Sequence, residues 1–147
     1  MLNSRLNAGD SKLERETLIG IKSVQVAIED LSPEAVSAGL TVGQIKTDVE
    51  PRIRKAGIVI VESADAPAVF VNARVMKHND VSYVYDVRVS LEQPVTTVAN
   101  TKLILAATWY TATLGYAGSG VIVRGVRDTV GDLVDEFLNA YLSVNPK

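Results

Sequence analysis

The sequence contains no cysteine, and this removes several kinds of chemistry at once. Disulfide bonds, thiolate nucleophiles, cysteine-ligated zinc and acylation of a cysteine in this chain all need that residue. There is also a single histidine, so a metal site would have to be rich in carboxylates. The acidic pairs of the chain fall at predicted strand ends or on helix surfaces, where solvation explains them. We therefore predict no metal site and no cofactor.

The chain also lacks an excess of either charge, because 15 Lys and Arg residues stand against 17 Asp and Glu residues. A net charge of -2 offers no electrostatic reason to expect a nucleic-acid partner. No apolar run approaches the ~20 residues that cross a bilayer, so we do not expect a membrane-spanning protein. The first ten residues lack the apolar core of a signal peptide. We expect a periplasmic or exported protein if a leader has been removed, and otherwise a cytoplasmic one.

What the sequence does contain is enough apolar material for one packed domain. At 147 residues and 47% hydrophobic content, we expect a single domain over residues 1–147, with residues 1–15 as an irregular N-terminal arm.

The segment Leu40–Val61 gives the clearest local signal, which is a capped helix followed by a buried strand. Thr41 and Gln44 have the spacing of a capping box, and Gly57 can supply the left-handed residue that ends the helix. Pro51 falls inside the helical pattern, so we expect a kink or break near residues 47–50.

Four further segments have strand patterns. We predict a bulged first strand at Leu18–Ile28, a hairpin of Ala68–Met76 and Val81–Gln93 around a turn at 77–80, and a long strand at Lys102–Thr113. The second hairpin arm alternates cleanly, with Val87 and Val89 on one face and Asp86 and Arg88 on the other. One sheet face should therefore be wet at this strand.

An apolar stripe at helical spacing, from Val130 to Leu142, predicts a long C-terminal helix. Together these patterns predict an α+β fold: a two-layer sandwich whose mostly antiparallel sheet of four or five strands carries two main helices on one face. A glycine-rich connection, residues 114–120, should join the long strand to the last helix. It lacks the lysine and Ser/Thr of a P-loop, so we interpret it as a mobile connector.

Catalytic chemistry has few candidates. His78 falls in the predicted hairpin turn, and the sequence shows no serine or cysteine nucleophile motif that this histidine could activate as a general base. Asp86 and Arg88 lie one pleat apart, which is typical of surface ion pairs. The aromatic group Trp109, Tyr110 and Tyr116 has two interpretations. Either Trp109 is core and the tyrosines are sheet surface, or the group forms an apolar patch that meets a partner.

Three segments resemble small exported bacterial proteins of unassigned function: GLTVGQIKTDVEPRIRKAGI at Gly39–Ile58, ATWY at Ala107–Tyr110 and DLVDEFLNAYLSVNP at Asp132–Pro146. From residue 18 onward the outline is also similar to the N-terminal α/β domain of the Tol-Pal translocation protein and to envelope transport-auxiliary lipoproteins. The chain departs from both in having no lipobox cysteine and no propeller domain. The resemblance implies an interaction module of the cell envelope and transfers no functional motif to individual residues.

Two functions stay open. The first is a non-enzymatic interaction or accessory domain of the bacterial cell envelope. The alternative is a small-molecule-binding domain or enzyme with a pocket between the sheet and the glycine-rich segment 114–120, where Asp86, Arg88, Tyr110 and Tyr116 are the side chains suited to line it.

Alternation in the long strand groups Leu103 and Leu105 with Trp109 on one face, and it places Ile104 and Tyr110 on the other. Both faces are therefore apolar, yet two helices can cover only one face of a small sheet. We therefore predict a protein partner or a homodimer that uses the open sheet face or the edge. Tyr110 and Ile104 should contribute more to this interface than Trp109.

Overall fold

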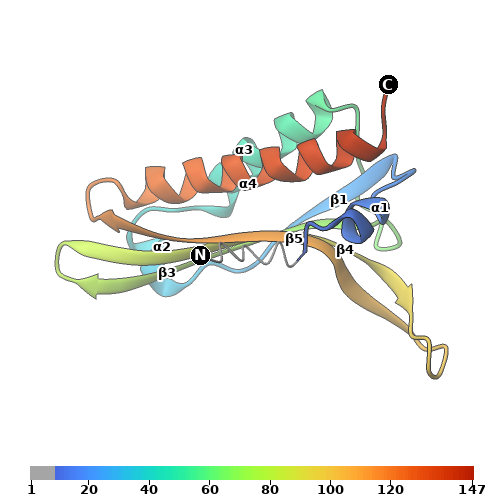
Figure 1. Ribbon diagram of the computed structural model, residues 1–147. Helices are drawn as coiled ribbons and strands as arrows, with labels where there is room; N and C mark the ends of the chain where they lie inside the picture. The colour runs from blue at the N-terminus through green and yellow to red at the C-terminus, as the bar shows by residue number, and fades with distance from the viewer. Residues whose placement is uncertain (1–8) are drawn as a thin grey trace, which may run out of the picture.

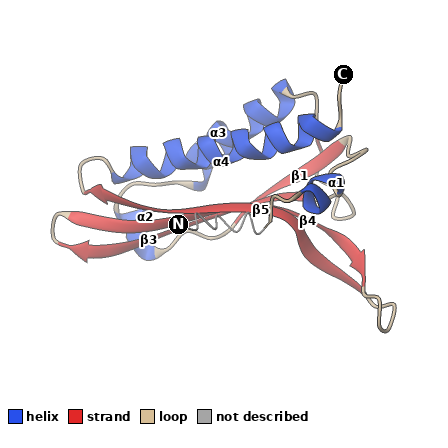
Figure 2. Cartoon of the chain, viewed as in Figure 1, coloured by secondary structure: helices blue, strands red, loops and turns tan. Residues whose placement is uncertain are grey.

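A computed structural model describes residues 9–147 and places them in two layers. A five-stranded sheet has the order β2-β1-β3-β4-β5, and the two main helices, α3 and α4, lie on one of its faces (Figures 1 and 2). The elements are α1 (Lys12–Glu16), β1 (Ser23–Ile28), α2 (Pro33–Ser37), α3 (Val42–Lys55), β2 (Val59–Ile60), β3 (Ala68–Asn79), β4 (Ser82–Thr96), β5 (Leu103–Gly118) and α4 (Ile122–Val144). The predicted α+β sandwich is confirmed.

The sheet is mixed, with long antiparallel pairings on one side and short parallel ones on the other. β3 pairs with β4, and β4 with β5, in antiparallel register. β1 pairs in parallel with both β2 and β3, which requires the crossover that α3 provides. Most of the ladder is therefore antiparallel, as the alternating pattern of β4 predicts.

α3 begins as its sequence predicts. The Gln44 N–H donates to Thr41 Oγ1 at 3.2 Å, and the Thr41 N–H donates to Gln44 Oε1 at 2.9 Å, which completes the capping box. Gly57 ends the helix with φ of 88°. Of the predicted kink or break near residues 47–50, the break is wrong, because α3 runs through Pro51 as one helix. Pro51 is exposed, so water can solvate the carbonyl that its ring leaves without a donor.

The core lies between the helices and the sheet. Val87, Val89 and Leu91 of β4 are fully buried against α4, whose stripe is centred on Phe137. α3 contributes Ile45, Val49 and Ile53 over β1 and β2.

The first strand is shorter than predicted, because residues 17–20 form a turn and β1 begins at Ser23. Gly20 has φ of 79° in this turn. Asn145, at the end of α4, accepts from the Gly20 N–H and donates to the Leu18 carbonyl. These tertiary hydrogen bonds replace the ladder that the apolar pattern alone suggests. The helix α1 begins inside the predicted irregular arm 1–15 and ends just beyond it, at Glu16. Residues 1–8 of that arm lie outside the described part.

The glycine-rich segment is not the predicted connector, because β5 continues through Gly118 and leaves only residues 119–121 between β5 and α4. Gly115 is needed within the strand. A Cβ at this position would lie 2.1 Å from Tyr85 Cζ on the neighbouring strand. The Tyr85 ring therefore occupies space that only a glycine leaves open, and its hydroxyl lies 3.3 Å from Thr129 Oγ1 of α4.

A β-bulge changes which way the long strand faces. Leu91 pairs with Trp109, but the next residue, Glu92, pairs with Ala107. Thr108 of β5 is therefore an extra residue without a partner on β4. The side chains of Leu103 and Leu105 consequently share a face with Tyr110, and Ile104 takes the opposite face. The predicted grouping of Leu103 and Leu105 with Trp109 is therefore wrong.

Candidate binding surface

Four of the five predicted site residues lie on the sheet face opposite α3 and α4, which we call the open face. Residues that pair across a sheet point to the same side, and Arg88 pairs with Ala112 while Ser90 pairs with Tyr110. Asp86 and Tyr116 belong to the same alternation. The sheet brings these four residues to one surface.

Trp109 is the exception, because it is fully buried beneath the helices. Its ring centroid lies 5.4 Å from that of Phe137, at an interplanar angle of 60°. The interpretation of Trp109 as core is therefore confirmed, and the residue cannot contact a partner at the open face.

A carboxylate from the N-terminal region completes the environment of Trp109. The indole Nε1 donates to Asp10 Oδ1 at 2.6 Å, and both carboxylate oxygens of Asp10 accept from Arg15 at 2.7 Å. Burial alone would raise the pKa of Asp10, but the hydrogen bonds from Arg15 and Trp109 and the charge of Arg15 together lower it. The hydrogen bond that Arg15 donates to Asp10 in turn raises the pKa of Arg15.

Sequence reasoning missed Asp10. The signal available was Trp109 itself, since a buried indole N–H needs an acceptor. Nothing in the spacing identifies which of the carboxylates of the chain provides it.

Polar side chains occupy the middle of the open face. The Arg88 guanidinium carbon lies 4.2 Å from the centroid of the Tyr110 ring, in a cation–π arrangement. Asp86 pairs across the ladder with Arg74, whose guanidinium lies 3.7 Å from Glu29 Oε1. Tyr110 is thus held in place by Arg88, and it is half-buried.

Apolar side chains gather at the end of the open face near the β3–β4 turn. Met76, Val84 and Tyr116 follow one another across three strands, and Leu114 lies beside them on β5. His78 belongs to β3, not to the turn as predicted, and its ring meets Tyr116 edge-on with centroids 6.0 Å apart. This contact explains His78 as a packing partner of an exposed tyrosine.

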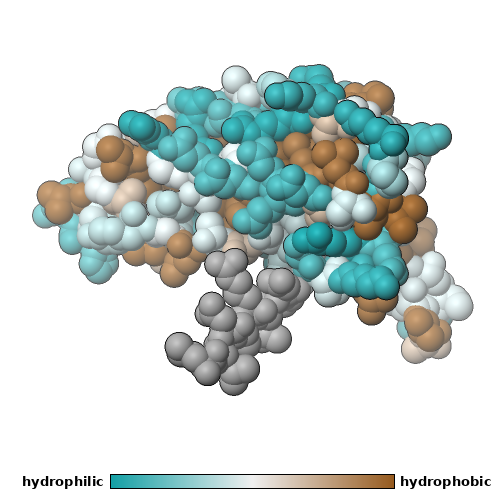
Figure 3. Space-filling model, turned by 45° about the horizontal axis from the view of Figure 1, so that its top comes forward, coloured by the Kyte–Doolittle hydropathy of each residue, from teal (hydrophilic) through white to brown (hydrophobic). Residues whose placement is uncertain are grey.

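The second apolar region is the projecting end of the β4–β5 hairpin, residues 94–105, which we call the arm. Beyond the bulge the two strands bend away from the rest of the sheet and extend past the helices (Figure 1). Val98 is 100% exposed, Leu103 is 71% exposed and Leu105 is 63% exposed. Hydrophobic residues are visible at the far end of the arm in the space-filling view, at lower right (Figure 3).

The charge pattern of the same region is unusual. From Gln93 to Val123 the sequence carries a single charged residue, Lys102. Exposed strands are normally interrupted by charges or prolines that discourage pairing with other chains. Here the arm and all of β5 have only two such residues, which are Pro94 at the base of the arm and Lys102 next to its tip.

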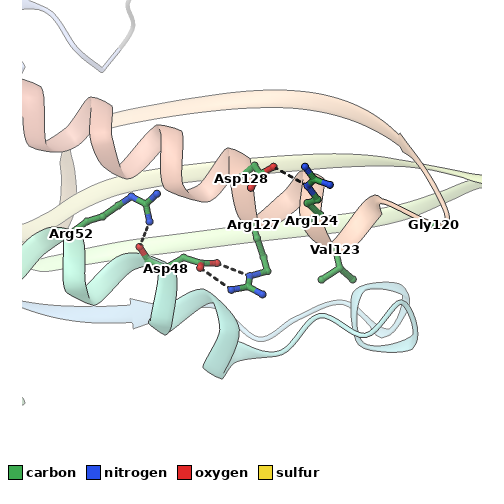
Figure 4. Close-up of a pocket in the computed structure, with 7 residues that line it drawn as sticks. All are labelled: Asp48, Arg52, Gly120, Val123, Arg124, Arg127 and Asp128. Atoms are coloured by element: carbon green, nitrogen blue, oxygen red, sulfur yellow. Dashed lines mark hydrogen bonds and ion pairs between the residues drawn. The ribbon is translucent and has the colours of Figure 1, made fainter.

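A cleft between α3 and the start of α4 contains three arginines (Figure 4). Arg127 donates to both oxygens of Asp48 at 2.8 and 2.9 Å, and Arg52 lies 3.2 Å from Asp135. These ion pairs join the two helices, and the pairing raises the pKa of Arg127. Because the charges are already matched, we interpret the cleft as a structural contact.

Other kinds of site find little support in the described residues. The alternative function needs a pocket between the sheet and a loop at 114–120. Residues 114–118 belong to β5, so this loop does not form one wall of a pocket. Within residues 9–147, no three His, Asp or Glu side chains are grouped to hold a metal ion. Over the same range, no helix is both long and apolar enough to cross a membrane.

No protein-family model matches the sequence, and no curated protein matches it. Among solved structures, the chain is similar to a minor lipoprotein from Acinetobacter baumannii, with 10% identity over 86% of this chain and 95% of that one, and a TM-score of 0.48. It is also similar to a PelC variant from Paraburkholderia phytofirmans, solved as a dodecamer, with 18% identity over 90% of this chain and 92% of that one, and a TM-score of 0.42. Both TM-scores are below 0.5, so the likeness carries no argument about function or assembly. The resemblance to the Tol-Pal protein stays a prediction.

Proposed function

We propose that this protein is a non-enzymatic interaction domain of the bacterial cell envelope that binds a protein partner or a second copy of itself through the arm and the open face. The observation that carries the proposal is the arm, which exposes Val98, Leu103 and Leu105 beyond the reach of both main helices. Exposed apolar groups of this kind mark interaction surfaces, because burying them against a partner is favourable.

The composition of the open face is also typical of a protein-binding surface. Tyrosine and arginine are enriched where proteins meet, and Tyr110, Tyr116 and Arg88 lie on this face. Tyr110 is already oriented by Arg88, so less side-chain freedom would be lost on binding. The assignment to the envelope rests on the sequence resemblance to exported proteins.

Site-specific photo-crosslinking in the bacterium that makes the protein tests the binding surface. A photoreactive residue at Leu105 should give a discrete adduct. The same residue at Leu13 on α1, which is 74% exposed, should not. Equal labelling at both positions, or none at Leu105, would contradict the role of the arm.

Cell fractionation of the natural gene product tests the compartment, and periplasmic or membrane-associated protein is the expected result. A purely cytoplasmic distribution would remove the envelope from the proposal. Turnover of a hydrolase or transferase substrate that a point substitution on the open face abolishes would replace an interaction domain with an enzyme.

A further inference from the structure

We propose that two copies of this protein join edge to edge through β5, with Ala112–Tyr116 of one copy pairing antiparallel to the same segment of the other. The inference rests on the self-association named in the proposed function, and it places the contact between copies at the β5 edge beside the open face, away from the arm. It assigns both the segment and the register, from the backbone geometry of one strand.

β5 is an edge strand, and residues 9–147 occupy only part of its outer side. The Tyr110 N–H points outward and donates to the Gly9 carbonyl at 3.0 Å. Outward groups recur at every second residue of a strand, so the N–H and C=O groups of Ala112, Leu114 and Tyr116 point outward too. Within residues 9–147, no backbone group bonds to the outward N–H of any of these three.

The position of the two-fold axis follows from these three residues. With the axis at Leu114, that residue faces its own copy, and Ala112 faces Tyr116 of the second copy. This register uses every outward group of the segment and would form about six backbone hydrogen bonds. It also avoids Tyr110, whose N–H is already bound.

The side chains fit the same register. Leu114 is 73% exposed and Tyr116 is 64% exposed, both on the open face. A small alanine would lie opposite each large tyrosine, while the two leucines would contact one another across the axis. The segment from Ala112 to Gly118 has no charged residue, so two copies do not repel each other along the strand.

A second copy fits the β5 edge better through a two-fold axis than through a head-to-tail contact. A head-to-tail contact would join β5 to the opposite edge of the sheet, which is β2. β2 has only 2 residues, so it would leave most of the β5 edge unpaired. Pairing β5 with itself matches length to length and gives a closed dimer.

The absence of cysteine makes the register directly testable in the full chain. Leu114→Cys should oxidise to a disulfide-linked dimer, because directly hydrogen-bonded residues have Cα atoms about 5.5 Å apart, within disulfide range. Ala112→Cys and Tyr116→Cys should each stay monomeric on a non-reducing gel, yet link when the two reduced proteins are mixed and then oxidised. Thr113→Cys, beside Leu114 but on the other face, is the matched control.

Efficient self-linking of Ala112→Cys or Tyr116→Cys alone would overturn the register. So would a Thr113→Cys protein that links as fast as Leu114→Cys, since random collision would then explain both.

Sedimentation equilibrium tests the dimer without any cross-link. Leu114→Lys should raise the dimer dissociation constant at least about tenfold, because two like charges would meet at the axis. Val59→Lys places the same charge on the β2 edge and should leave the constant unchanged. A parent protein that stays monomeric across the micromolar range would overturn the inference, while photo-crosslinking at Leu105 would still report separately on the arm.

Discussion

At the scale of single residues, Asp10 and Gly115 each settle a local conflict created by a large aromatic side chain. Asp10 supplies the acceptor that the buried indole of Trp109 needs, and Arg15 holds it in place. Gly115 leaves the space that the ring of Tyr85 fills between β5 and α4. Both residues act on partners far away in the sequence.

Asp10→Ala should destabilise the fold by about 1–3 kcal/mol, because it leaves the indole N–H of Trp109 buried without an acceptor. Asp10→Asn keeps an acceptor oxygen and should cost less. Denaturant titration followed by fluorescence measures both, and Trp109 is the sole tryptophan of the chain. Equal costs for the two substitutions would show that the lost charge, not the lost acceptor, matters.

Asp10 should also make stability depend on pH. Its pKa is lower in the folded protein than in the unfolded chain, so its stabilising effect is complete above the unfolded pKa of about 3.9. The effect is lost as the pH falls from there through the folded pKa, since the unfolded chain then binds the proton more readily. When the pH falls from 5 to below the folded pKa of Asp10, the free energy of unfolding should decrease more for the parent protein than for Asp10→Asn. Parallel pH profiles would contradict this.

Gly115→Ala should destabilise the protein by about 1–3 kcal/mol, because the added methyl group displaces the Tyr85 ring and its contact with Thr129. Gly118→Ala is the control in the same strand. A Cβ there would lie 3.7 Å from its nearest neighbour, the Val81 carbonyl oxygen, which is an ordinary contact, so the change should stay within about 0.5 kcal/mol. Thermal unfolding of the two variants checks the difference, and a neutral Gly115→Ala would mean that Tyr85 moves at no cost.

At the scale of elements, α4 does most to hold the sheet in shape. It packs over β4 and β5, joins α3 through Arg127 and Asp48, and fastens the turn before β1 through Asn145. Tyr141 adds a hydrogen bond from its hydroxyl to the Ile21 carbonyl at 2.8 Å. One helix therefore contacts the sheet, the neighbouring helix and the N-terminal turn.

Phe137→Ala should cost about 3–5 kcal/mol, because the ring is fully buried between Trp109 and Tyr141. Asn139→Ala, on the exposed side of the same helix, should change stability by no more than about 0.5 kcal/mol. Equilibrium unfolding in urea compares the two. Similar small effects would show that α4 is not firmly docked on the sheet.

At the scale of the whole molecule, the sheet extends further than the helices that cover it. The two-layer part is compactly packed, and the arm leaves it as a two-stranded ribbon (Figure 2). A ribbon without a covering layer buries little apolar area, so its conformation depends on the β4–β5 hydrogen bonds.

Hydrogen exchange should reveal this division. Amides of the arm should exchange at least about tenfold faster than those of Val87–Leu91, which are covered by α4 and paired on both sides. Mass spectrometry of peptides from residues 94–105 and 86–91 makes the comparison. Protection of the arm that appears only at high protein concentration would indicate that a second copy covers it. Strong protection in the monomer would contradict the division into two parts.

The sequence alone determined the fold class and the most regular of the elements, because these depend on local periodicity. The capping box at Thr41, the alternation of β4 and the stripe of α4 each follow from residues a few positions apart. Four of the five predicted site residues are on one face for the same reason, since alternation in β4 and β5 decides which way they point. The sequence left two interpretations of Trp109 open, and the structure supports the one that places it in the core.

Tertiary structure alone decided the features that join distant residues. Trp109 bonds to Asp10 across 99 positions, and the bulge opposite Leu91 reverses the face of Leu103 and Leu105 relative to Trp109. Residues 114–118 became strand, not loop, because β4 was long enough to pair with them and Tyr85 filled the space above Gly115. Local patterns cannot supply such information, because the free energy that selects these arrangements comes from partners brought together only when the chain has folded.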